Sequence, residues 1–244
     1  MIWLECCDVG LLYEEDKKMT DFSKIPAQSS LIDSALQEQL KGILGKLERD
    51  VVIKAVLEDD EKGTELGSFL KAVAGLCDRI HLELYGKEDS PSLIVEQCCE
   101  GLLPSFGLYG EGGTYTGISF AGIPGGKEIN SFVLALYNVA GSGQPLEDTV
   151  KSRITLLSGK KHMQICVSLA CHHCADVVTA CQRIASLNPD MSAQMIDARL
   201  YPELVKKYQI ERVPVLIVNE THTFLGGKTM EEILTILETL ENPT

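Results

Sequence analysis

Basic side chains are scarce in this sequence, and long apolar runs are missing from it. The chain has 244 residues with 22 Lys and Arg against 35 Asp and Glu, so its formal net charge is −13. Free nucleic acid and anionic membranes are bound through basic patches, so we expect neither as a partner. No apolar stretch approaches the roughly 20 residues that a membrane-spanning helix needs. A Gly-x-Gly-x-x-Gly dinucleotide-binding fingerprint is also missing.

The first residues lack the features of a secretory signal peptide. They begin Met-Ile-Trp-Leu-Glu and soon turn acidic, without a basic start or a small-residue cleavage site. The nine cysteines are an odd number and include the adjacent pairs Cys6-Cys7 and Cys98-Cys99, unlike a secreted disulfide framework. We therefore expect a cytoplasmic protein. In that compartment a close cysteine pair is more often catalytic or metal-binding than structural.

The length and composition allow one large domain or two domains of about 100 residues each. The clearest boundary is the stretch Ala-Gly-Ser-Gly-Gln-Pro at residues 140–145. We predict a loosely ordered extension at 1–30, a first domain at 31–145 and a second domain at 146–244. Residues 1–159 carry 14 Lys and Arg against 25 Asp and Glu. This acidic surface is either simply solvated or a docking face for a basic partner.

Hydrophobic periodicity predicts alternating helices and strands, and therefore an α/β fold. In the first domain we expect helices beginning at Asp33 or Ser34 and near Leu66, a helix at 128–139, strands at 51–57, 80–84 and 93–95, and loops throughout the Gly-rich stretch 101–117. In the second domain we expect helices at 146–157, from about Cys171, at 202–208 and from Thr229, and strands at 163–169, 193–196, 215–218 and 223–225.

The second domain repeats the pattern of the first. A shift of 112 residues places Ile53 on Ile165, and a shift of 123 places Pro91 on Pro214. A shift of 104 places Gly122 on Gly226. Repeats of this kind indicate two copies of one small α/β unit. The first copy has Asp-Asp-Glu-Lys at residues 59–62, where the second has Cys-His-His-Cys at 171–174.

The Cys-x-x-Cys sequence carries the chemistry of the second copy. The pair follows an expected strand and opens an expected helix, where unpaired N–H groups and the helix dipole favour a thiolate. We assign Cys171 as the nucleophile and the deeper Cys174 as the resolving thiol. Protonated His172 and His173 would favour the thiolate further, although both also fit solvated turn residues. In the Val213-Pro214 pair before the next strand, we expect a cis bond facing the cysteines, with a plain strand-start proline as the alternative.

These features resemble the thioredoxin/glutaredoxin superfamily. The closer resemblance is to the N-terminal region of the flavoprotein component of alkyl hydroperoxide reductase, its F subunit, over residues 31–240. The residues that carry it are Ser168–Val178, Leu187-Asn188-Pro189, Met195-Ile196-Asp197, Val213-Pro214, Met230–Ile233 and, in the first copy, Phe120-Ala121-Gly122, Pro124, Gly126, Glu128 and Ser131–Leu136. The resemblance implies two fused thioredoxin-like folds, of which only the second carries a redox-active Cys-x-x-Cys.

The resemblance also implies a function. In that family the double fold passes electrons from a thioredoxin-reductase-like flavoprotein dithiol to a peroxiredoxin disulfide. Glu128 occupies the position of a glutamate that lies near the redox pair, although it also fits a first-turn helix acid. We expect no cofactor on this chain, with FAD and NAD(P)H on a separate donor. His173 and Ala175 replace the Asn and Pro usual at those positions, which leaves the reduction potential open.

Two other functions remain open from the residues alone. The first is a metal-binding module built on the Cys-His-His-Cys turn, for which further ligands could come only from single histidines such as His162 and His222. We expect no metal site, because a second ligand pair is missing. The second is a non-catalytic interaction scaffold that uses the acidic first fold. Cys77, Cys166 and Cys181 are most simply core residues.

Overall fold

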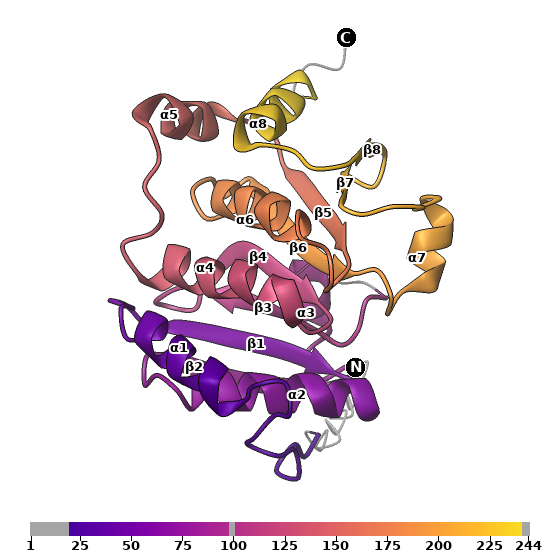
Figure 1. The fold of residues 1–244 in the computed structure, drawn as a ribbon. Helices are drawn as coiled ribbons and strands as arrows, with labels where there is room; N and C mark the ends of the chain where they lie inside the picture. Colours follow the sequence, from indigo (N-terminus) through magenta and orange to yellow (C-terminus); the bar gives the residue numbers. More distant parts are fainter. Residues whose placement is uncertain (1–19, 98–100, 241–244) are drawn as a thin grey trace, which may run out of the picture.

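The computed structural model describes residues 20–97 and 101–240, and it contains one mixed sheet covered by helices on both faces (Figure 1). The strands follow the spatial order β2-β1-β3-β4-β6-β5-β7-β8. Their bounds are β1 Val51–Leu57, β2 Ile80–Gly86, β3 Ser105–Tyr109, β4 Tyr115–Ala121, β5 Lys161–Val167, β6 Met191–Asp197, β7 Val215–Val218 and β8 His222–Leu225.

The sheet consists of two halves with the same topology. In each half the first strand lies parallel to the second and antiparallel to the third, and the third and fourth form an antiparallel hairpin. The halves meet where β4 runs parallel to β6, from Ile118 opposite Ala193 to Ala121 opposite Ile196. The expected pair of fused thioredoxin-like folds is therefore confirmed, and their strands form one continuous sheet.

The helices divide the core into layers. Their bounds are α1 Ser34–Leu44, α2 Glu61–Ala74, α3 Pro91–Glu96, the 3-10 turn η1 Gly126–Glu128, α4 Ile129–Ala140, α5 Asp148–Leu156, α6 Cys174–Ala185, α7 Pro202–Lys207 and α8 Met230–Thr239. The main core lies under α1, α2, α4, α5, α6 and α8 and extends across both folds. Two smaller clusters form on the opposite face, one with α3 and one with α7. Successive strand residues point to opposite faces, so each strand serves both layers.

The chain preceding the first fold packs against it from residue 20 onward. Phe22 and Ile25 lie against the main core. The Lys71 ammonium donates hydrogen bonds to the carbonyls of Phe22 and Ile25, at 2.8 and 2.9 Å. These contacts hold Phe22 and Ile25 against the first fold, and the order of the extension as a whole stays a prediction. Residues 1–19, with Cys6 and Cys7, lie outside the described residues, as do Cys98 and Cys99.

Local sequence signals predicted several element boundaries correctly. The strands at 51–57 and 215–218 have the expected bounds. Asp33 caps α1 through a hydrogen bond from the Leu36 N–H. Thr229 and Glu232 form the capping box of α8, as their spacing predicts. The limits of the two predicted domains, at residues 31, 145 and 146, remain predictions.

Two expected features of the first fold are wrong. Residues 93–95 lie in the helix α3, not in a strand, because Ser90 and Pro91 begin a helix and a short apolar run suits either structure. The Gly-rich stretch 101–117 contains β3 and the start of β4. Its glycines serve the hairpin in two ways. Gly112 and Gly113 adopt positive φ at the turn, and Gly107 leaves room within β3 for the Gln97 side chain.

The repeat is real, but two of the three expected shifts are wrong. The peptide bonds before Pro104 and Pro214 are both cis. The Gly122 N–H donates to the Pro104 carbonyl and the Gly226 N–H to the Pro214 carbonyl, both at 2.9 Å, which confirms the shift of 104 for the glycines that follow β4 and β8. The first strands correspond with a shift of 110, not 112. An error of two residues keeps each side chain on its own face, which is why the apolar pattern still matched. Pro91 corresponds to Pro202, not Pro214, since each begins a short helix.

Candidate redox site

The cysteine pair lies on the turn between β5 and α6. Cys171 and Cys174 form a disulfide, with their Cα atoms 5.6 Å apart. The helix begins at Cys174, three residues later than expected, and His173 is its N-cap. Only Cys174 therefore lies in the first helical turn, and Cys171 precedes the helix.

The two sulfur-bearing residues differ in exposure as predicted. Cys171 is half-buried, and Cys174 is fully buried. Cys174 faces the core because Val177, Val178 and Cys181 follow it at helical spacing on the buried side. A protein partner can reach Cys171 without unfolding the helix, whereas Cys174 can be reached only from within the molecule.

The other described cysteines fit the expected packing role. Cys166 and Cys181 are fully buried, and Cys77 is half-buried and donates a hydrogen bond to the Leu44 carbonyl. Burial raises the pKa of the Cys166 thiol to about 12 and raises the pKa of Cys181 still further. A thiol with such a pKa stays protonated at neutral pH and is a poor nucleophile.

The bond between Val213 and Pro214 is cis, as the sequence predicts. It lies directly before β7, which pairs with β5 and therefore borders the strand that leads into the redox turn. Val213 and Cys171 both pack against the edge of the main core. A second cis bond, Leu103–Pro104, precedes β3 in the first fold and was not predicted. The two prolines occupy equivalent positions, because Pro104 immediately precedes β3 just as Pro214 precedes β7. This repeated position is the sequence signal for the second cis bond.

Glu128 is the buried acid that the first fold contributes beside the redox turn. Its side chain is fully buried, and its Oε2 accepts a hydrogen bond of 2.6 Å from the Ser131 hydroxyl. Its Oε1 is buried without a partner. Burial raises the pKa of Glu128 to about 7. The Ser131 hydrogen bond acts in the opposite direction, and the nearby charges of Asp176 and Asp197 raise the pKa further.

A backbone contact between the folds positions Glu128. The Lys127 N–H donates a hydrogen bond of 2.9 Å to the Leu169 carbonyl on the redox turn. Gly126 has a φ of +55°, and a Cβ there would lie 2.5 Å from the same carbonyl oxygen. A glycine is therefore required for η1 to approach the turn this closely, and η1 also packs against α6.

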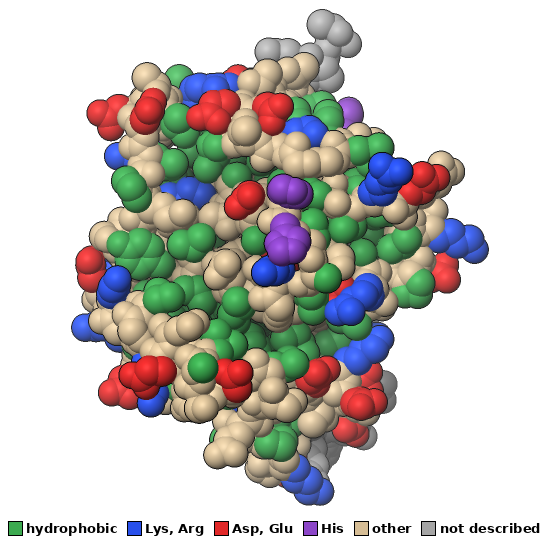
Figure 2. Space-filling view, viewed as in Figure 1, with side chains coloured by type: hydrophobic (Ala, Val, Ile, Leu, Met, Phe, Trp, Pro, Cys, Tyr) green, Lys and Arg blue, Asp and Glu red, His purple; other side chains and the backbone are tan. Residues whose placement is uncertain are grey.

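Two surface hollows border the redox turn, and a third lies at Pro214. His172 lines a groove of about 410 Å³ between α1, α4 and α6, and His173 lines a smaller hollow of about 340 Å³ between α6 and α8. The third, of about 530 Å³, contains Val213 and Pro214. Both histidines are exposed. Figure 2 shows two neighbouring histidines near the middle of this face, with hydrophobic side chains beside them.

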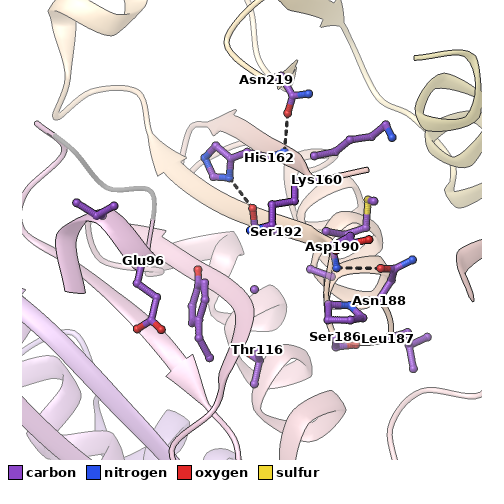
Figure 3. Close-up of a pocket in the computed structure, with 17 residues that line it drawn as sticks. Glu96, Thr116, Lys160, His162, Ser186, Leu187, Asn188, Asp190, Ser192 and Asn219 are labelled. Atoms are coloured by element: carbon purple, nitrogen blue, oxygen red, sulfur yellow. Dashed lines mark hydrogen bonds between the residues drawn. The ribbon is translucent and has the colours of Figure 1, made fainter. Parts of the chain in front are cut away.

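A further hollow, of about 620 Å³, lies away from the redox turn (Figure 3). It contains His162, at the beginning of β5, whereas the turn follows the end of that strand. The His162 Nδ1 is 2.9 Å from the Ser192 hydroxyl, and burial lowers the pKa of this histidine to about 4. Within residues 20–97 and 101–240, no group of three or more His, Cys, Asp or Glu side chains is arranged to hold a metal. No helix among them is long and apolar enough to cross a membrane.

Comparisons with known proteins agree with this architecture. The model of the thioredoxin domain family matches residues 161–238. Two curated relatives are the alkyl hydroperoxide reductase F subunit of Pseudomonas aeruginosa, 34% identical over 86% of this chain, and a Bacillus subtilis protein named NADH dehydrogenase, 30% identical over 84%. The chain spans only 38% and 37% of the lengths of these two proteins.

Two solved structures are also similar to this chain. The N-terminal domain of the alkyl hydroperoxide reductase protein AhpF of Enterococcus faecalis is 44% identical, with a TM-score of 0.80 over 84% of this chain and 99% of that one. A protein disulfide oxidoreductase from Aeropyrum pernix shares the fold, with 20% identity, a TM-score of 0.76, and coverage of 86% of this chain and 93% of that one. The chain therefore belongs to the AhpF family of alkyl hydroperoxide reductase proteins and corresponds to its N-terminal pair of thioredoxin-like folds.

Proposed function

We propose that this chain is a thiol–disulfide oxidoreductase that carries electrons to a peroxiredoxin disulfide. The observation that carries the proposal is the Cys171–Cys174 disulfide, with one sulfur accessible and the other buried at the start of α6. The names of the relatives support the peroxide-reducing context. The electron donor is a flavoprotein dithiol of the thioredoxin-reductase type, which holds the FAD and takes hydride from NAD(P)H.

Reduction of the acceptor takes two exchange steps. The Cys171 thiolate attacks one sulfur of the acceptor disulfide, and the other acceptor sulfur leaves as a thiolate. The Cys174 thiolate then attacks the Cys171 sulfur and releases the second acceptor thiolate. The chain ends as the disulfide, and the acceptor has gained two electrons and takes up two protons. The donor dithiol reverses this sequence on the chain and restores both thiols.

The supporting residues act on protons and on the approach of the acceptor. Buried Cys174 must lose a proton before it can resolve the mixed disulfide. Glu128, with a pKa of about 7, is suited to accept that proton and return it. Protonated His172 and His173 favour the Cys171 thiolate. The backbone of Val213, directly before β7, pairs with the extended acceptor segment in this proposal.

Substitution of single cysteines tests the proposal. With NADH and a thioredoxin-reductase-type flavoprotein, the wild-type chain should reduce an oxidised two-cysteine peroxiredoxin, and Cys171→Ser should abolish this activity. Cys174→Ser should accumulate a mixed disulfide through Cys171, visible by mass spectrometry. Cys77→Ser, at a thiol outside the redox turn, is the matched control and should keep full activity. Activity retained in Cys171→Ser, or zinc that co-purifies and blocks disulfide formation, would contradict the proposal.

A further inference from the structure

An apolar groove begins at the redox turn and extends along the first fold. Helix α4 packs between α1 and α6, and the groove of about 410 Å³ lies over these three helices. Its apolar wall consists of Leu36, Leu40, Ile43, Ile129, Val133 and Leu134. The charged groups that line it, Lys127 and Asp176, belong to the elements at the redox turn, as does His172. The rest of the lining is Gln39, Asn130, Ala175 and Thr179, so the part of the groove on α1 and α4 is mainly apolar.

The groove is open to a binding partner. Ile43 is 39% exposed, and it is one of few large hydrophobic side chains in the described residues with such exposure. Leu36, Ile129 and Leu134 are half-buried, so each presents part of its side chain to the surface. Figure 2 shows hydrophobic surface on this face of the molecule. Contiguous exposed apolar surface of this kind marks interaction sites in soluble proteins.

We propose that this groove binds apolar side chains next to the reactive cysteine of the oxidised peroxiredoxin. The inference rests on the proposed function, because exchange brings an acceptor sulfur into contact with the Cys171 sulfur. The acceptor residues beside that sulfur must then lie on the surfaces that border Cys171. His172, the next residue in the chain, and Ala175 both line the groove, so the groove is continuous with the reaction site.

The chemistry of the three hollows favours this groove over its neighbours. The hollow between α6 and α8 contains Lys228 and Glu232 besides Asp176, which it shares with the groove, and the one at Pro214 contains Glu211 and Arg212. Ionised side chains suit a polar segment, whereas the groove along α1 and α4 suits an apolar one. Most of its wall belongs to the first fold. That fold has no Cys-x-x-Cys sequence, and docking gives it a direct part in the reaction.

A charge placed in the groove tests the proposal. Ile43→Glu should raise the KM for oxidised peroxiredoxin by about tenfold, because a carboxylate must be desolvated when an apolar segment docks. Its rate with 5,5′-dithiobis(2-nitrobenzoate), a small disulfide that needs no groove, should stay within about twofold of wild type. Leu156→Glu, at a 78% exposed leucine on α5 outside the groove, is the matched control and should change neither value. Gln39→Arg, at an exposed groove position, provides a second variant should Ile43→Glu fold poorly.

A crosslinking experiment locates the partner directly. In the Cys174→Ser background, benzoylphenylalanine at position 43 should crosslink to the trapped peroxiredoxin, and the same group at position 156 should not. Unchanged KM values for peroxiredoxin in Ile43→Glu and Gln39→Arg would contradict the docking proposal and leave the proposed function intact. A KM change confined to the flavoprotein donor would overturn it by assigning the groove to that protein. A wild-type chain inert toward both disulfides would instead contradict the proposed function.

Discussion

Burial acts differently on each titratable side chain near the redox turn. It raises the pKa of the Cys166 and Cys181 thiols so far that both remain protonated core residues. It raises the pKa of Glu128 only to about 7, which leaves this carboxyl able to change its protonation at neutral pH. The same physical cause therefore produces inert thiols and a titratable acid, because the ordinary pKa of a carboxyl starts about four units lower.

Glu128 should make the stability of the protein depend on pH. Its pKa is 4.5 in a solvated chain and about 7 in the folded protein. Between these two pH values the Glu128 carboxyl is protonated in the folded state and ionised in the unfolded state. The stabilisation is therefore complete below pH 4.5 and is lost as the pH rises through 7. The loss is about 3 kcal/mol, from about 1.4 kcal/mol for each unit of pKa shift.

Urea denaturation at about pH 5 and pH 8 measures this effect. The free energy of unfolding of Glu128→Gln should fall by about 2.5 kcal/mol less between the two pH values than that of wild type. Ser131→Ala is a useful companion, because it removes the one hydrogen bond to the carboxyl and leaves the acid in place. Equal pH dependence in wild type and Glu128→Gln would show that Glu128 is ionised at low pH despite its burial.

At the scale of elements, η1 can approach the redox turn closely because residue 126 is a glycine. Gly126 lets the first fold approach the Leu169 carbonyl, and Lys127 then forms its hydrogen bond to that oxygen. A methyl group at position 126 would clash with the Leu169 carbonyl oxygen. A backbone atom cannot move aside as the end of a flexible side chain can. The contact between η1 and the redox turn therefore depends on one residue without a Cβ.

Gly126→Ala should lower both the stability of the protein and its rate of disulfide exchange. The positive φ costs about 1–2 kcal/mol in any residue with a Cβ, and the clash with Leu169 adds to this. Displacement of η1 should also remove Glu128 from the redox turn and slow resolution of the mixed disulfide. Gly112→Ala is the control, because Gly112 has a φ of +82° with nothing within 4 Å. The control should lose stability without a change in the exchange rate measured by stopped flow, and equal rates in both variants would contradict this account.

At the scale of the whole molecule, the parallel pairing of β4 with β6 makes one sheet of two folds. The hydrophobic cores of the two folds are also joined, since buried residues of both folds belong to one cluster. Arg183 on α6 also donates a hydrogen bond of 2.7 Å to the Gln144 carbonyl in the connecting segment. The folds should therefore unfold together rather than one at a time.

Ile118→Ala tests this cooperativity. Ile118 is fully buried on β4 opposite Ala193, and an isoleucine-to-alanine change in a core costs about 2–5 kcal/mol. Hydrogen exchange should accelerate in β1 and β5 alike, and calorimetry should give a single transition at a lower Tm. If amides of β1 lose protection while those of β5 keep it, the two folds unfold independently. Leu156→Ala, at an exposed site, should leave exchange in both strands unchanged.

Local and repeating patterns in the sequence predicted much of this protein. Alternating apolar residues predicted β1 and β7, and the spacing of Thr229 and Glu232 predicted a cap, because these features depend on a few neighbouring residues. The repeat and the Cys-x-x-Cys pair predicted two folds and one redox site. The cis bond before Pro214 followed from the same fold pattern.

Only the tertiary structure decided the features that depend on contacts between distant residues. The run at 93–95 reads equally as helix or strand until Pro91 and the packing of α3 are known. The pKa of Glu128 depends on burial between two folds, and the need for Gly126 depends on a carbonyl 43 positions away in the chain. The continuous sheet depends on β4 meeting β6. A linear pattern records which side chains face a core, whereas closeness in space arises only when the cores pack together.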